Sequence, residues 1–180
     1  MRRAAFALIV LTGLLWAGAA DAARIRMFSY DPDNAETRHA AGPLTFEFRQ
    51  QLIFNTVLRI RATEASATAE LKPVDEKVLG KGGLSPLIGQ NAQERDLYEV
   101  SPKEEGEAMI SAFCPGSKHA WMAFGRLRAN RDLTVHVLGD GPDGGAKLCH
   151  TFAFRFHGEW QAQQGVTVNP RDMPGSHFPF

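Results

Sequence analysis

Four side chains have the chemistry to bind a metal ion or to transfer a proton. His119, His136 and His150 carry imidazoles and Glu159 carries a carboxylate, which are ligand types that Zn²⁺ accepts. His136 and His150 fall on consecutive predicted strands, and Glu159 could join them if the strand register aligns. Their spacing matches no compact ligand motif such as His-x-His. We therefore interpret the three histidines as isolated residues and assign no metal ligand, catalytic residue or cofactor. His119, His136, His150 and Glu159 remain weak candidates for a metal site.

Three glycine-containing stretches match known site motifs only in part. Residues 83–87 (Gly-Leu-Ser-Pro-Leu) lack the final glycine of a nucleophile elbow. Residues 80–83 (Gly-Lys-Gly-Gly) lack the earlier glycine of a phosphate-binding P-loop. Asp140 and Asp143 lack the alternating ligands and terminal glutamate of a calcium loop. A Ser-His-Asp set assembled only by folding stays open, because triads are defined by geometry and not by order.

The two cysteines, Cys114 and Cys149, predict a disulfide. We predict four strands of an up-and-down meander around them, at 108–114, 120–128, 132–138 and 148–157. The first and fourth strands of a flat sheet lie about 14 Å apart, whereas a disulfide needs Cα atoms within roughly 7 Å. The bond therefore requires a sheet that curls into a barrel or a sandwich. The alternative is a helix through Phe113, which removes this four-strand argument.

The first 22 residues have the pattern of a secretory signal peptide. Arg2 and Arg3 precede an apolar run over 4–16, and Ala-Asp-Ala at 20–22 fits a cleavage site. The cleaved chain would carry a net charge of −1. This charge favours neither nucleic acid nor an anionic membrane as a partner. We expect an exported protein, periplasmic or extracellular, with no stable membrane insertion after cleavage, in a compartment that favours disulfides.

Alternating apolar residues predict the remaining strands. Leu44, Phe46 and Phe48 share one strand face, and Phe152, Phe154 and Phe156 share another. These aromatic faces favour a core, although in a small barrel they could also line a lipophilic pocket. Further strands are predicted at 24–30, 54–63 and 67–71, short helices at 33–41, at 91–98 and from Ser101, and a loop at 139–145. The apolar and glycine-rich stretch 72–90 is expected to pack on the body, where it could cross a barrel mouth.

These patterns together predict a mainly β, single-domain fold. We expect about eight antiparallel strands in a β-sandwich or curled β-barrel, with two or three short helices. The domain would span 23–160, and 161–180 would form a C-terminal strap or tail that is rich in proline and glycine.

The expected function is a non-enzymatic, exported binding module for a small apolar ligand or a protein partner. An incomplete set of catalytic motifs and an aromatic β core favour this hypothesis. The alternative is a metal-dependent or hydrolytic periplasmic enzyme that uses the scattered histidines. An outer-membrane barrel is a third class, but Pro170, Pro174 and Pro179 interrupt what would be its closing strand.

Overall fold

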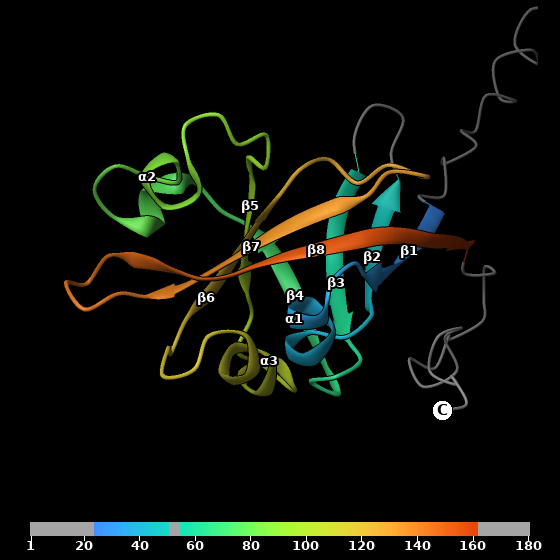
Figure 1. Cartoon of the computed structure of the whole chain (residues 1–180), viewed down its shortest axis with the longest axis horizontal. Helices are drawn as coiled ribbons and strands as arrows, with labels where there is room; N and C mark the ends of the chain where they lie inside the picture. Colours follow the sequence, from blue (N-terminus) through green and yellow to red (C-terminus); the bar gives the residue numbers. More distant parts are fainter. Residues whose placement is uncertain (1–23, 51–54, 162–180) are drawn as a thin grey trace, which may run out of the picture.

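Each strand pairs with its neighbours in the sequence, and the last strand pairs with the first. The computed structural model describes residues 24–50 and 55–161, in which eight antiparallel strands close into a barrel (Figure 1). The strands are β1 (Arg24–Pro32), β2 (Leu44–Gln50), β3 (Asn55–Ala62), β4 (Ala67–Pro73), β5 (Asp96–Val100), β6 (Ala120–Phe124), β7 (Leu133–Asp140) and β8 (Ala146–Gln161). The short helices are α1 (Ala35–Ala40), the 3₁₀ helix η1 (Glu76–Leu79), α2 (Ser85–Ile88) and α3 (Gly106–Phe113). The predicted mainly β fold is confirmed, and it is the barrel.

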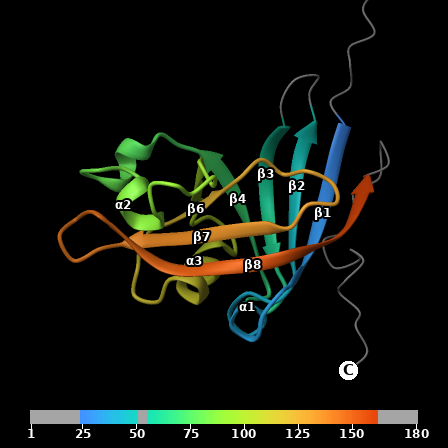
Figure 2. The same cartoon turned by 45° about the horizontal axis from the view of Figure 1, so that its top comes forward.

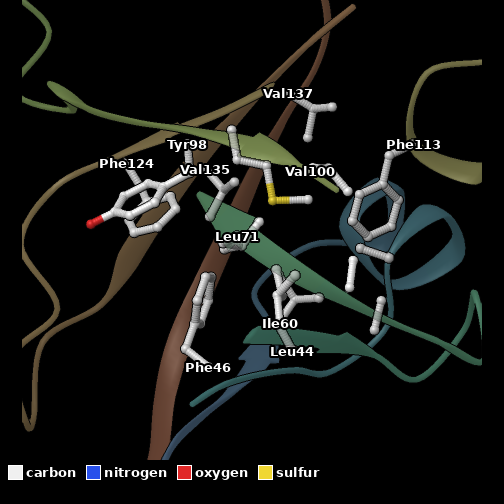
Figure 3. Close-up of a cluster of buried hydrophobic side chains, with 14 of the residues drawn as sticks. Leu44, Phe46, Ile60, Leu71, Tyr98, Val100, Phe113, Phe124, Val135 and Val137 are labelled. Atoms are coloured by element: carbon white, nitrogen blue, oxygen red, sulfur yellow. The ribbon is translucent and has the colours of Figure 1, made fainter. Parts of the chain in front are cut away.

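Aromatic rings fill the interior of the barrel. Phe46, Phe48 and Phe152 are completely buried, as the alternation of their strands predicted. The ring centroids of Phe46 and Phe124 lie 5.2 Å apart, and Figure 3 shows both rings within the packed cluster of core side chains. Burying one such ring contributes about 1.5–3 kcal/mol to the free energy of folding. The interior is therefore a packed core, and space for a ligand has to be sought at its edge.

Helix α3 packs against one end of the barrel, close to α1 (Figures 1 and 2). Met109, Ile110 and Phe113 are buried in the core, and the ring of Phe113 lies 5.4 Å from that of Phe152. Spacings of three and four residues place apolar side chains on one helix face. The strand predicted at 108–114 was therefore wrong, and the alternative helix through Phe113 is correct. The helix begins at Gly106, later than the start predicted at Ser101.

The disulfide between Cys114 and Cys149 is confirmed, with its Cα atoms 5.4 Å apart. Cys114 is the residue at which α3 ends, so the four-strand geometry used to place the bond was wrong. On β8, His150 is paired with Val137 and Leu148 with Leu138, which leaves Cys149 as the extra residue of a β-bulge. The bond therefore joins the helix at the barrel end directly to the barrel wall.

A second apolar cluster lies on the outside of the barrel. Leu97, Trp121 and Leu138 are buried although their strand positions point outward, because Leu79 and Leu84 cover them. We call this group the outer cluster. The stretch 72–90 thus packs on the body, as predicted, but against the outer face of β5, β6 and β7. Apolar side chains on an outward face need such a cover, since exposed apolar area is unfavourable.

Several predicted boundaries differ from the structure. The helix predicted at 91–98 is wrong, because β5 begins at Asp96 and pairs with β6. Gly139 and Asp140 extend β7 into the predicted loop, and β6 ends at Phe124 instead of Arg128. Asn34, and not Asp33, caps α1 by accepting a hydrogen bond from the amide of Thr37 at 2.7 Å.

Two predicted segments fall on the ends of the chain. The signal peptide at 1–22 lies outside the described residues, as does the strap or tail at 161–180 except for Gln161. Within the described ranges, no helix has the length and apolar character needed to cross a membrane.

Candidate ligand-binding site

The barrel wall has a gap beside the first half of β3. Strand β3 pairs with β4 from Arg59 to Ala62, and β4 pairs with β5 from Leu71 onward. Asn55 and Val57 therefore precede the part of β3 that pairs with β4, and they face the start of β5 across the gap. A pocket of about 450 Å³ occupies this gap. Pockets for small molecules commonly measure roughly 300–1,000 Å³.

The pocket has an apolar floor and a polar rim. Val57, Tyr98, Phe124 and Leu127 form the floor, and each is at least nine-tenths buried. The rim consists of Asn55, Gln93, Arg95, Asp96, Gly125 and Arg126. The pocket lies at the start of β5 and the end of β6, whereas α3 connects the other ends of these two strands. The pocket therefore lies at the opposite end of β5 and β6 from the end that α3 covers.

Tyr98 brings the main polar group of the floor. Its ring stacks on Phe124 with the centroids 4.8 Å apart and the planes nearly parallel, and Figure 3 shows its hydroxyl pointing away from the core cluster. Burial, with a smaller contribution from the carboxylate of Asp96, raises the pKa of Tyr98 to about 12. No residue of the described part of the chain hydrogen bonds to this hydroxyl. Tyr98 thus offers a neutral, unused hydrogen-bond donor to the pocket.

The two rim arginines differ in how their guanidinium groups are used. Arg95 donates to the carbonyl of Gln90 at 2.8 Å, to the hydroxyl of Ser85 at 2.9 Å and to the carbonyl of Ala92 at 3.1 Å. Arg126 is exposed and forms no ion pair with any described residue. Arg95 therefore holds the rim in shape, whereas the guanidinium of Arg126 remains available to a ligand.

The rim segment around Arg95 is also tied to the barrel from outside. Glu94, which lies between the rim residues Gln93 and Arg95, has a carboxylate oxygen 3.6 Å from Nε2 of His136. His136 is 8% exposed, and its Nδ1 lies 3.0 Å from the hydroxyl of Thr151. The candidate ligand His136 thus has a structural role, because it anchors the chain that forms one side of the pocket.

His119 lies at the far end of β6 from the pocket. Its Nδ1 is 3.0 Å from Asp140, and its ring stacks on Trp121. Partial burial disfavours the charged carboxylate of Asp140, but hydrogen bonds from His119 and from the amide of Lys118 outweigh it and lower the pKa of Asp140. This arrangement closes a turn of the chain, and Asp140 thereby acquires a structural role that sequence motifs did not reveal.

His150 and Glu159 have other partners and lie on different parts of β8. His150 stacks on Phe152 and has Nδ1 3.7 Å from Glu36 of α1. Glu159 accepts hydrogen bonds from the guanidinium of Arg26. Across residues 24–50 and 55–161, no group of three or more His, Cys, Asp or Glu side chains could hold a metal ion. The structure therefore does not assemble the four sequence candidates into one site.

None of the pocket residues was among the candidates predicted from the sequence. The floor of the pocket combines Val57 of β3, Tyr98 of β5 and Phe124 of β6, which meet because β3 and β4 separate beyond Arg59. The strand pattern of Leu97, Tyr98 and Val100 could have shown that Tyr98 lies near the core. No local spacing could have shown that its hydroxyl faces a pocket.

No family model, no curated protein and no solved structure matches this chain.

Proposed function

We propose that this chain is an exported protein that binds a small, largely apolar molecule in the pocket between β3 and β5. The pocket itself carries the proposal: about 450 Å³ above a floor of four buried apolar and aromatic side chains. Concave, mainly apolar sites with a few polar groups are typical of small-molecule binding. The ligand lies at the barrel edge, because aromatic side chains fill the interior.

Export is supported by two independent features of the chain. Residues 1–22 have the pattern of a signal peptide, with a basic start, an apolar run and a cleavage motif. The Cys114–Cys149 disulfide is typical of proteins that fold in oxidising compartments. The protein would therefore meet its ligand outside the cytoplasm.

Filling the pocket tests the proposal. A Cβ atom at Gly125 would meet only the carbonyl of Gln93, at 3.9 Å, so Gly125→Phe places a ring at the rim with little strain on the backbone. Gly145 is a matched control in the β7–β8 hairpin, where a Cβ would meet only the carbonyl of Leu79, at 3.6 Å. The probe is the neutral fluorophore N-phenyl-1-naphthylamine, titrated into the purified, disulfide-bonded protein.

We expect saturable binding to the wild type and to Gly145→Phe. Gly125→Phe should weaken binding by at least about tenfold, which corresponds to about 1.4 kcal/mol. Absence of saturable binding to the wild type would overturn the proposal. Equal affinities of all three proteins would also overturn it, because the probe would then bind elsewhere.

A further inference from the structure

We propose that the pocket selects ligands that carry one carboxylate on an apolar body, with the carboxylate held by Tyr98 and Arg126. This inference rests on the proposed binding function and names the chemical class of the ligand. It combines three features of the pocket: an unpaired donor on a buried ring, an unpaired guanidinium, and the sign of the charge at the rim.

The donor is the hydroxyl of Tyr98, whose buried ring carries it to the pocket. The residue is only 8% exposed, and its hydroxyl has no hydrogen-bond partner among the described residues. The hydroxyl opens onto the pocket, where a ligand oxygen that accepts its proton would replace water as its partner. Because the pKa of Tyr98 is raised to about 12, the hydroxyl keeps this proton over the physiological pH range. The floor thus favours a ligand with an acceptor at its buried end.

The charged residues of the rim favour a negative charge on that acceptor. Arg95 and Arg126 bring two positive charges to the pocket, and Asp96 brings one negative charge. A carboxylate accepts the proton of Tyr98 and pairs with the free guanidinium of Arg126, and such charge-assisted hydrogen bonds are stronger than neutral ones. A ligand ammonium could pair with Asp96, but it would meet two guanidinium groups. The balance therefore favours the anion.

The apolar floor of the pocket determines which ligand body fits beside the carboxylate. Val57 and Leu127 are aliphatic, and Phe124 presents an aromatic ring beside that of Tyr98. This floor matches a flat or compact hydrocarbon body. A second charge on the ligand would lie against these buried apolar side chains at a cost of desolvation.

Three probes with one body and different head groups test the inference. Naphthalene-2-carboxylate, naphthalene-2-carboxamide and 2-(aminomethyl)naphthalene each compete with N-phenyl-1-naphthylamine for the wild-type protein. We expect the carboxylate to displace the fluorophore with an affinity at least about tenfold higher than that of the amide or the amine. If the fluorophore binds in the pocket but the amide or the amine competes equally well, the inference is overturned and the proposed function stands. If the fluorophore does not bind at all, both fall.

Two variants assign the effect to the named residues. Arg126→Gln should remove the preference for the carboxylate over the amide, measured as the ratio of their affinities for the same variant. Tyr98→Phe should weaken binding of both the carboxylate and the amide, and of the carboxylate more, since both lose the same donor and the bond to the carboxylate is charge-assisted. Arg131→Gln removes an exposed arginine from the same β6–β7 connection, outside the pocket lining, and is the matched control. An equal loss in Arg126→Gln and Arg131→Gln would indicate a general effect of charge and would overturn the assignment to Arg126.

Discussion

Replacement of Cys114 and Cys149 by alanine would remove the bond that joins α3 to the barrel wall. The two residues are 35 positions apart, and the loop that they close contains β6 and β7. On the chain-entropy model, opening a loop of this length costs about 4 kcal/mol of stability. That loss is a large fraction of the roughly 5–15 kcal/mol that stabilises a typical domain.

The expected loss arises mainly in the unfolded chain. Met109 and Phe113 are buried in the core by apolar contacts, so we expect the native contacts of α3 to persist without the bond. Urea unfolding of the double variant should therefore show a lower midpoint and also a larger m-value, because the unlinked chain exposes more surface when it unfolds. The reduced wild type is the matched control, since it lacks the bond and keeps both sulfur atoms.

Two results would refute this reasoning. A loss below about 1 kcal/mol in both proteins would mean that the loop constraint does not limit the unfolded chain. Faster hydrogen exchange confined to α3, with an unchanged m-value, would mean that the bond acts on the native state by holding the helix in place.

Two further predictions follow from packing and ionisation. Gly106→Ala should lower the free energy of unfolding in urea by at least about 1–3 kcal/mol, because the new Cβ would lie 1.8 Å from the carbonyl oxygen of Ser101. Gly125→Ala is the control, since its Cβ would lie 3.9 Å from the carbonyl oxygen of Gln93. Equal stabilities of the two variants would contradict the predicted clash. Burial raises the pKa of both tyrosines, that of Tyr98 to about 12, whereas the pKa of a tyrosine in the unfolded chain is about 10. The folded protein should therefore show little tyrosinate absorbance near pH 10. The stability that the protonated tyrosines contribute is fully present below that pH and should fall as the pH rises towards the folded pKa. Full ionisation of the tyrosines in the native protein at pH 10 would contradict this prediction.

The strands with clear alternation were predictable from the sequence. Phe46 and Phe48 in β2, and Phe152 and Phe154 in β8, point inward because each strand has one apolar face and one polar face. α3 was mistaken for a strand because it is short and ends in a cysteine and a turn. Its buried residues Met109, Ile110 and Phe113 fit helical spacing, but a run of this length also fits a strand.

The candidate site could not be predicted in the same way. Its residues come from β3, β5, β6 and two loops, and they meet only because β3 and β4 separate beyond Arg59. The histidines were candidates because imidazoles bind metals and transfer protons. In the structure, His136 contacts Glu94 of the rim segment and His150 contacts Glu36 of α1. Residue chemistry alone did not distinguish these structural contacts from a site.

The pairing of β1 with β8 has a consequence for the order of folding. Arg26 and Glu159 meet across a sequence separation of 133 residues, so closure of the barrel is among its most distant contacts. Contacts of this kind slow folding, because a long loop must close before the pairing stabilises the chain. Until β8 arrives, the edge of β1 is an unpaired template to which another chain could add. Cys149 lies on the same late strand, so formation of its disulfide with Cys114 could capture β8 and shorten the period in which that edge is open.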